Sequence, residues 1–290
     1  MALGPYYIQL DSSFGEDFSE YEFSPEGIPM TRFQRRPDWQ HNPITVCQYG
    51  LFQFNHYLKT GSEQAKQAFL TQADWLLSQA QEGPNQSSVW YYQVEIPFYK
   101  LRPPWISGMT QGEALSLLLR AYQLTKDKRY FDVAQNTWKS FSVPVAKGGI
   151  LSHYPDGSVV IEEYPSRPPS CVLNGTIFAL FGVYDYAVTT QDSQALMLFQ
   201  QSLEGLARNL HRYDTGFWSL YDLWEPARLA SRSYHRLHIA QLKALGQLSH
   251  QSVFQMTADR WQGYLHSPFC KFRWALNKLS QKVFQKTKFK

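Results

Sequence analysis

The chain alternates between two kinds of hydrophobic pattern, each about one helix long. In segments such as 114–122 and 177–184 almost every position is apolar, which predicts a helix that is covered on all sides. Segments such as 65–77 and 196–210 instead carry apolar residues at a 3.6-residue period, which predicts an amphipathic helix with one face in water. Polar turn and N-cap residues separate the two helices of each pair, for example at 60–62, as a helical hairpin requires.

The helix pairs recur at a nearly constant interval. The buried helix of each pair carries an amide side chain near its start, and these amides are spaced by about 63 to 67 residues: Gln48, Gln111, Asn174 and Gln241. An inner ring of buried helices wrapped by an outer ring of amphipathic helices is an α/α barrel (toroid), with an open solenoid as the alternative. We therefore predict an all-α dominated fold, an α/α barrel of four helical hairpins.

Long connections lead from each outer helix to the next inner helix, over about residues 83–104, 142–173 and 211–237. Residues 150–162 predict a β-hairpin, and residues 89–96 predict a further strand. In an α/α barrel these connections all emerge at the end where the inner helices begin. We therefore expect β-hairpin insertions, and the functional site, at that end.

Helix N-termini that converge at one end favour an anionic ligand, because they present unpaired N–H groups and the positive ends of helix dipoles. Several arginines fall in segments expected to reach this end: Arg32, Arg35, Arg36, Arg102, Arg167, Arg212, Arg228, Arg232 and Arg236. We expect some of them to lie in solvent or to pair with structural carboxylates. Asp185 and Asp222 are candidates for such pairs.

Composition narrows the class of protein. Aromatic residues make up 16% and charged residues 18% of the chain, below the usual charged share of about 25%; this fits a carbohydrate-facing cleft, or simply a large aromatic core. The net charge of +4 does not indicate a nucleic-acid partner. Three scattered cysteines fit a reducing compartment. We find no signal peptide or membrane-spanning run and expect a cytoplasmic protein without a cofactor or metal.

The end of the chain is basic. No acidic residue follows Asp259, while Phe272, Leu276, Leu279 and Val283 recur at helical spacing. Two interpretations stay open: a last helix packed on the barrel with a solvated basic face, or a weak contact with anionic lipid or a polyanionic glycan. We divide the chain into an N-terminal extension (1–41), a catalytic barrel (42–265) and a basic amphipathic tail (266–290).

Tyrosines, carboxylates and histidines gather in the loops ahead of the inner helices, which suggests proton transfer. Exchanging the proton beside the carboxyl group of a uronic acid requires a base, neutralisation of the carboxylate and an acid on the opposite face. Tyrosine can serve if nearby cations hold its pKa well below about 10. Around Tyr234 the sequence offers such neighbours: Arg228, Arg232, Arg236, His235 and His238. The two histidines lack a third ligand near them in sequence, which argues against a metal site.

Residues 162–164 end the predicted hairpin with Glu-Glu-Tyr. Alternate residues of a strand point to opposite faces, so only one of Glu162 and Glu163 is expected to point into the cleft. The alternative is a solvated acidic hairpin end beside a packed tyrosine. Trp105 has two interpretations as well, a platform for a sugar ring or a residue that staples the second inner helix.

At these loops the chain resembles the D-glucuronyl C5-epimerases, in particular their C-terminal catalytic domain. The resemblance covers about residues 42 to 265 in the family's order. The matching stretches are 42–51, 104–112, 120–127, Glu162-Glu163-Tyr164-Pro165, 172–175, Tyr184-Asp185, 213–216, Tyr221-Asp222-Leu223 and Tyr234-His235 with His238 and Gln241-Leu242.

The resemblance implies an α/α barrel that inverts C5 of glucuronate to give iduronate within a heparan-type or related polysaccharide. It also implies that Tyr164, Tyr221 and Tyr234, assisted by Glu163, exchange the C5 proton; which tyrosine serves which face stays open. From the loops and the resemblance together we predict a set of substrate-binding residues. They are Trp105, Gln111, Arg167, Asn174, Arg228, Arg232, His235, Arg236 and His238.

Three alternatives to the epimerase stay open. A uronate polysaccharide lyase would expel the 4-O substituent from the same carbanion. A glycoside hydrolase would need two spaced carboxylates, for which Glu163 with Asp185 or Asp222 is the available pairing. A glycan-binding protein would carry the tyrosines without catalysis. In each case the expected partner is an anionic polysaccharide, and a homodimer is compatible with the sequence.

Overall fold

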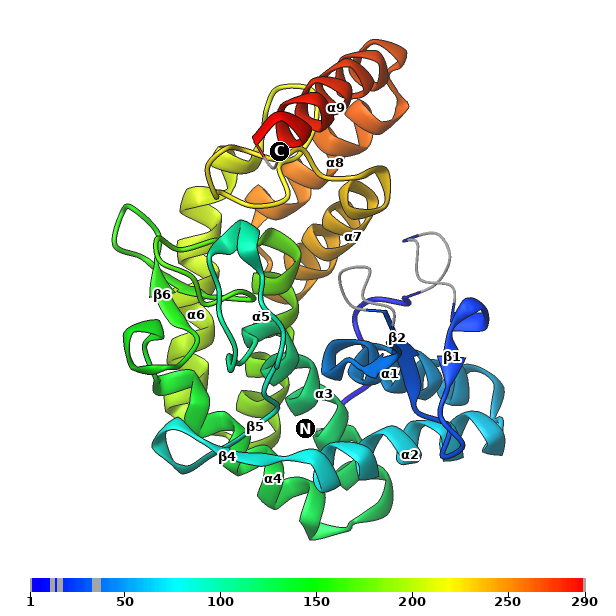
Figure 1. Cartoon of the computed structure of the whole chain (residues 1–290). Helices are drawn as coiled ribbons and strands as arrows, with labels where there is room; N and C mark the ends of the chain where they lie inside the picture. Colours follow the sequence, from blue (N-terminus) through cyan, green and yellow to red (C-terminus); the bar gives the residue numbers. More distant parts are fainter. Residues whose placement is uncertain (1, 11–13, 15–17, 33–37, 289–290) are drawn as a thin grey trace.

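The computed structural model describes residues 2–10, 14, 18–32 and 38–288. Within this part of the chain the helices form four antiparallel hairpins, and the predicted α/α barrel is confirmed (Figure 1). The hairpins are α1–α2 (Pro43–Thr60, Glu63–Gln79), α3–α4 (Gly108–Thr125, Lys128–Trp138), α5–α6 (Leu173–Thr190, Ser193–Asn209) and α7–α8 (Arg232–Ser249, Ser252–His266).

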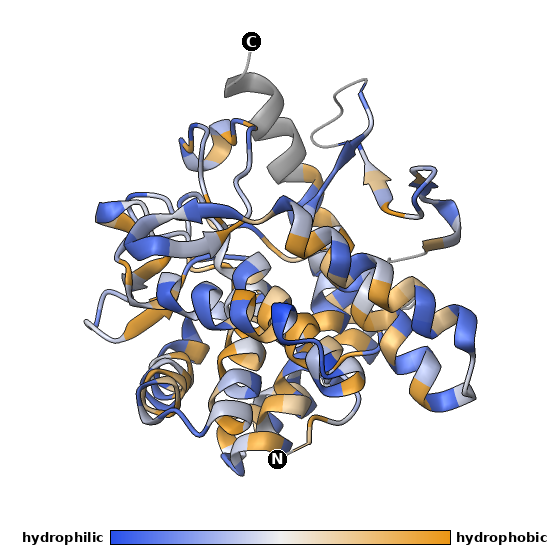
Figure 2. Cartoon of the chain, turned by 90° about the horizontal axis from the view of Figure 1, so that it is seen from below, coloured by the Kyte–Doolittle hydropathy of each residue, from blue (hydrophilic) through white to orange (hydrophobic). Residues whose placement is uncertain are grey.

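The first helix of each hairpin lies in the inner ring. Helix α1 packs on α3, α3 on α5 and α5 on α7; the run 108–121 of α3 is buried throughout, as its apolar pattern predicts. The outer helices turn their polar positions away from this ring (Figure 2). Among the described residues α7 does not pack side by side with α1, so the inner ring has a seam between them (Figure 1).

The turns inside the hairpins share the same capping pattern. The side chains of Ser62, Asp127 and Asp192 accept backbone N–H groups of the first turn of the outer helices, which satisfies donors that a helix start leaves unpaired. A residue in the left-handed conformation ends the preceding inner helix, as at Gly61. The sequence therefore places these hairpin turns accurately.

The strands are short and lie in the connections. Strands β6 (Leu151–His153) and β7 (Val159–Ile161) pair antiparallel, which confirms the predicted hairpin. Two further sheets are formed by β1 (Glu22–Phe23), β2 (Pro29–Thr31) and β3 (Gln40–His41), and by β4 (Gln81–Gly83) and β5 (Ser87–Val89).

The strand predicted over 89–96 is wrong in extent. Beyond β5 the chain forms only isolated bridges, from Tyr92 to Trp105 and from Ile96 to Leu101, among the described residues. The return segment contains Pro103 and Pro104, which have no N–H to donate to a ladder. Residues 89–105 therefore form a folded loop rather than a strand.

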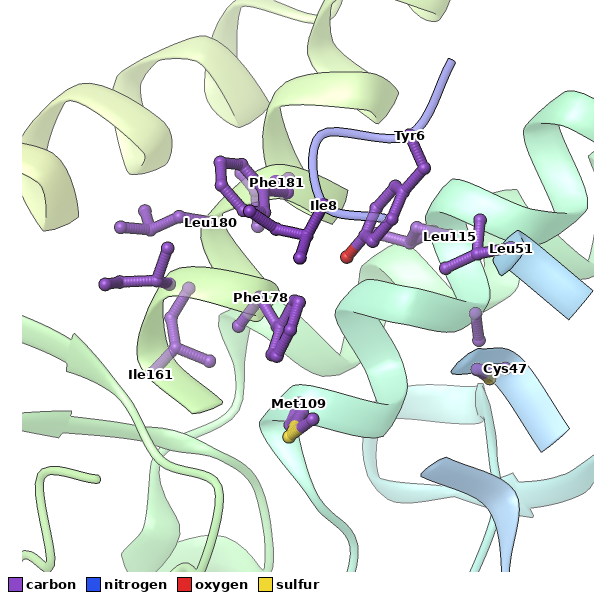
Figure 3. Close-up of a cluster of buried hydrophobic side chains, with 14 of the residues drawn as sticks. Tyr6, Ile8, Cys47, Leu51, Met109, Leu115, Ile161, Phe178, Leu180 and Phe181 are labelled. Atoms are coloured by element: carbon purple, nitrogen blue, oxygen red, sulfur yellow. The ribbon is translucent and has the colours of Figure 1, made fainter. Parts of the chain in front are cut away.

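The segment 2–10 reaches the barrel core through its buried side chains. Tyr6 and Ile8 lie in the core beside Phe178 and Phe181 of α5 (Figure 3). Asn55 of α1 accepts the N–H of Tyr6 at 2.6 Å and donates to its carbonyl at 3.1 Å. The N-terminal extension of the sequence-based division thus begins with a segment of the barrel core.

The last helix, α9 (Pro268–Lys288), follows α8 at the edge of the molecule (Figure 1). Cys270 is buried with Trp218, Leu229 and Ala230, and Trp274 packs against this cluster while its Nε1 donates to Ala230 O at 2.9 Å. None of the described helices combines the length and the apolar character that a bilayer crossing needs.

Candidate active site

A cavity of about 470 Å³ lies at the seam between α1 and α7, and we call it the α1–α7 cavity. All four inner helices contribute residues from their first turns, which confirms that the connections and helix N-termini meet at one end. The residues that line the α1–α7 cavity are Leu10, Phe14, Tyr21, Thr31, Arg32, Asn42, Ile44, Thr45, Gln48, Tyr92, Trp105, Met109, Glu163, Tyr164, Asn174, Phe178, Ser233, Tyr234 and Leu237. Four converging helix starts give this cavity a positive potential suited to an anion.

A second cavity of about 360 Å³ shares a wall with the first, and we call it the Arg228 cavity. Tyr164 and Tyr234 line both cavities. The full lining of the second is Ile96, Phe98, Tyr99, Tyr164, Tyr221, Arg228, Leu229, Ser231, Tyr234 and Lys278. Phenol groups therefore stand between two spaces that can hold neighbouring parts of a ligand.

The three tyrosines of the predicted site lie together. The rings of Tyr221 and Tyr234 meet edge to face with centroids 4.8 Å apart. Tyr164 stacks on Tyr99 at 4.7 Å and contacts Trp105 at 5.6 Å. Tyr164 and Tyr221 also influence each other electrostatically. Residues from three different connections thus converge on one point.

Glu163 follows strand β7, and its side chain lies against the first turn of α5, where it lines the α1–α7 cavity. The side chain of Glu162 turns the other way and accepts the backbone N–H groups of Ser170 and Cys171 at 3.0 and 3.1 Å. Glu163 lies against Gly175 of α5, where a Cβ atom would be only 2.2 Å from Glu163 Oε2. The expectation that one glutamate of the pair faces the cleft is confirmed, and Gly175 is the residue that gives it room.

Two buried acceptors of the α1–α7 cavity have no hydrogen-bond partner among the described residues: Glu163 Oε2 and Asn174 Oδ1. An unsatisfied buried polar atom costs about 1–3 kcal/mol. Glu163 and Asn174 therefore carry an unmet capacity for hydrogen bonding beside the cavity.

Burial controls the proton affinities here. It raises the pKa of Glu163 to about 8, against opposing contributions from Tyr164 and Arg228. It also raises the pKa values of Tyr164 and Tyr221 well above the usual value, and the charge of Glu163 raises them further. The expectation that cations lower the tyrosine pKa values is wrong for these two, because desolvation and a neighbouring carboxylate prevail.

Arg228 is held in a network. Its Nε donates to Asp222 Oδ2 at 3.0 Å, its Nη2 contacts Asp222 and Tyr99, and Tyr99 Oη donates to Asp222 at 2.6 Å. The guanidinium also lies 3.9 Å from the ring centre of Phe98 and 5.0 Å from that of Tyr221. Asp222 therefore pairs with a rim arginine as expected, and fixes its guanidinium beside the tyrosines.

The two histidines sit beneath the site. His235 stacks on Trp218 at 4.0 Å, its Nε2 lies 3.1 Å from Trp261 O, and its Nδ1 accepts the N–H of Ser219. Burial lowers the pKa of His235 to about 4 and that of His238 well below its usual value. Both are neutral near pH 7, so they do not supply the positive charge expected of them.

Comparisons with known proteins show the family to which the chain belongs. Residues 84–263 match the family described as D-glucuronyl C5-epimerase C-terminus. A D-glucuronyl C5-epimerase of Caenorhabditis elegans is 32% identical over 230 residues, which cover 72% of this chain and 36% of that protein. The chain belongs to the D-glucuronyl C5-epimerase family. It spans little more than a third of the length of the nematode epimerase.

Two further matches are a relative in sequence and a solved structure with a similar fold. An uncharacterised protein of Methanocaldococcus jannaschii is 32% identical over 242 residues, 77% of each chain. The crystal structure of the unsaturated glucuronyl hydrolase from Streptococcus agalactiae superposes with a TM-score of 0.51 at 16% identity, covering 76% of this chain and 58% of that one. At such identity the second likeness concerns the α/α barrel alone.

The remaining residues predicted to bind substrate lie at different depths in the barrel. Asn174 lines the α1–α7 cavity. Trp105 lines it too, but its ring is stacked on Tyr92 at 4.3 Å and its Nε1 donates to Val94 O, so it supports Tyr164 more than it offers a free face. Gln111 is completely buried and donates to Ser88 O and Ser140 Oγ.

Most of the expected rim arginines do not reach the cavities. Arg32 and Arg228 line them. Arg167, Arg232 and Arg236 are exposed and are not among the lining residues, and Arg232 lies over the Trp274 ring at 4.9 Å. Arg102 and Arg212 are also exposed. Arg35 and Arg36 fall outside the described residues.

Asp185 does not reach the rim either. It forms a fully buried ion pair of 2.5 Å with Arg120 and accepts Tyr7 Oη at 2.8 Å, so it is far along α5 from the site. The hydrolase pairing of Glu163 with Asp185 is therefore wrong.

Tyr99 lines the Arg228 cavity but is not predicted from the sequence. The stretch Pro97-Phe98-Tyr99 carries no pattern that distinguishes a site residue from a packed one.

No group of three His, Cys, Asp or Glu side chains that could hold a metal ion occurs in the part of the chain that the structure describes.

Proposed function

We propose that this domain inverts C5 of glucuronate units within a heparan-type or related uronate polysaccharide, through Tyr164, Tyr221, Tyr234 and Glu163. Membership of the epimerase family supports uronate epimerase chemistry. The observation that supports the residue assignment is how these side chains line two adjoining cavities. Tyr164 and Tyr234 line both, Tyr221 lines the Arg228 cavity and Glu163 lines the α1–α7 cavity.

The substrate carboxylate needs a positive environment, because removal of the C5 proton places negative charge on it. The inner-helix starts around the α1–α7 cavity provide one. Arg32 lines the α1–α7 cavity, and Arg228, which is paired with Asp222, lines the adjoining Arg228 cavity. Both features support binding of a uronate unit next to the phenol wall.

In the proposed reaction one phenolate takes the C5 proton, and a phenol on the opposite face of the ring returns a proton to the planar carbanion. Glu163 accepts the phenol proton of Tyr164 and so generates the base. Its pKa of about 8 keeps both of its protonation states accessible near neutral pH. We leave open which of Tyr221 and Tyr234 acts on which face.

The proposal is tested by incubating the protein in deuterated water with desulfated heparan-type and other glucuronate polymers, and following deuterium at C5 by NMR. Exchange should fall by about 100-fold or more in Tyr164→Phe and Tyr234→Phe, the range expected for a general acid or base. Tyr57→Phe, at the far end of α1, is the matched control and should keep full activity. Exchange that survives both site substitutions would refute the assignment.

The same incubation separates the alternatives. A lyase would form an unsaturated uronate that absorbs near ~232 nm, because the carbanion expels its 4-O substituent instead of being reprotonated. A non-catalytic glycan-binding protein would bind the polymer without exchange, and Tyr234→Phe would leave that binding unchanged.

A further inference from the structure

Helix α9 has one face on the barrel. Cys270 is buried, Trp274 is half-buried, and the two are one helical turn apart. Trp274 Nε1 donates to Ala230 O at 2.9 Å, and Lys278, the next residue of this row, lines the Arg228 cavity. The contacts with the rest of the protein are therefore made by the 270–274–278 side of the helix.

The opposite face of α9 is apolar and open to solvent. Phe269, Phe272, Leu276 and Leu279 are 66%, 62%, 50% and 61% exposed. Their spacing of three and four residues puts them in a single stripe along the helix, about half a turn away from Cys270 and Trp274. We call these four residues the α9 stripe. Such a stripe of large apolar side chains is not needed for packing on the barrel.

The α9 stripe lies in a basic environment. Lys271 and Arg273 belong to the same helix, and the sequence continues with Lys282, Lys286, Lys288 and Lys290 without an acidic residue after Asp259. Lys278 is not part of this group, because it faces the barrel. A surface helix with an apolar stripe between cationic residues is the pattern that lies in the interface of a bilayer rich in anionic lipid. No described helix is suited to cross the bilayer, which agrees with binding in the plane of the surface.

We propose that α9 binds this domain to the surface of anionic membranes, with the α9 stripe in the lipid and the lysines at the headgroups. A soluble polyanionic glycan would satisfy the lysines but would leave four large apolar side chains in water. A second copy of this chain would cover the apolar side chains but would bring two strongly basic helices together, which is electrostatically unfavourable. Anionic lipid satisfies both features.

Because Lys278 lines the Arg228 cavity, this helix would hold the proposed active site close to the membrane surface. The inference about α9 does not depend on the reaction, and a failed exchange assay leaves it untouched.

The test is flotation of the whole chain with vesicles of phosphatidylglycerol and phosphatidylcholine, compared with phosphatidylcholine alone. Binding should require the anionic lipid and should weaken as salt rises. The double substitution Phe272→Glu with Leu276→Glu should lower the partition coefficient by about tenfold or more. It removes two apolar side chains that would enter the lipid, and it adds negative charges that anionic headgroups repel. Leu196→Glu with Met197→Glu, which also replaces exposed apolar residues but on α6, is the matched control and should bind normally.

Circular dichroism shows whether both variants fold, which is expected because all four positions are exposed. The proposal is overturned if the wild-type chain ignores anionic vesicles, or if the α6 and α9 variants lose binding equally. It is also overturned if light scattering shows a dimer that only the α9 variant loses, since the stripe would then join two copies. Retention on a sulfated glycan column that depends on Phe272 and Leu276, without vesicle binding, would assign the surface to a glycan instead.

Discussion

Replacing Glu163 by glutamine separates the stability of the site from its chemistry. The Glu163 carboxyl is buried, with an exposed fraction of 3%, and its Oε2 has no hydrogen-bond partner among the described residues. Burial raises its pKa from 4.5 to about 8. Glutamine has nearly the same shape and carries no charge, so the substitution removes the ionisation and little else.

The sign of the effect follows from proton binding. Between pH 4.5 and 8 the folded protein keeps a proton on Glu163 that the unfolded chain has released, so the free energy of unfolding falls as pH rises through this window. A pKa difference of about 3.5 corresponds to roughly 5 kcal/mol above pH 8, and to about 3 kcal/mol at pH 7. Below pH 4.5 Glu163 no longer lowers the free energy of unfolding, because its carboxyl group is protonated in both the folded and the unfolded state. Glu163→Gln should therefore stabilise the protein at high pH and change little in acid.

Urea denaturation of both proteins at pH 4.5, 7 and 9 measures this difference directly. Comparing the variant with the wild type cancels the titration of groups that both share, such as His235. The expected result is a stabilisation that grows with pH, together with a loss of C5 exchange. A difference that is the same at every pH, or that grows towards acid, would refute the argument that Glu163 is held in an apolar environment against its ionisation.

Two further substitutions test the packing that positions the site. Gly182→Ala should destabilise the protein by about 3 kcal/mol or more in a thermal or urea melt. The new Cβ would lie 2.0 Å from Gly112 O and would force α3 and α5 apart. Gly246→Ala, where the nearest neighbour is 3.4 Å away, is the control and should be neutral or stabilising. Asp185→Asn leaves the buried Arg120 without its counter-charge, and should lower the free energy of unfolding by about 3–5 kcal/mol in urea.

The sequence predicts the barrel well because its information is local. Apolar runs and N-cap residues such as Asp127 and Asp192 each act within one hairpin. The spacing from Gln111 to Asn174 then shows that the hairpin repeats. The insertion of Tyr6 and Ile8 into the core has no local signal, because the segment is too short to show periodicity. Its place is decided by residues far along the chain, such as Asn55 and Arg120.

The site likewise has features that the sequence predicts and features that depend on contacts between distant residues. The resemblance to the epimerases names Tyr164, Tyr221 and Tyr234, and the barrel brings together the connections and the start of α7 that carry them. Whether a residue in such a loop faces the cavity depends on neighbours that the sequence does not reveal. Arg167 is exposed and Arg232 lies over the Trp274 ring, so neither lines a cavity. Proton affinity is harder still to predict, because it depends on how far each group is removed from water.

Burial, which makes Glu163 costly for stability, also makes it suited to its proposed role. A carboxylate with a pKa near 4.5 is a poor acceptor for a phenol proton, whereas one with a pKa of about 8 is a far better one. The charge of Glu163 is the second cause of the raised pKa of Tyr164, after burial. That charge disappears when Glu163 takes the proton, so the transfer relieves part of the repulsion that opposed it. Only the ionised form of Glu163 can accept the phenol proton, and with a pKa of about 8 that form is the minority at neutral pH. A substrate carboxylate at the helix starts brings a second negative charge near Glu163 and disfavours its ionisation further. C5 exchange should therefore rise with pH up to about pH 8, as the ionised fraction of Glu163 grows.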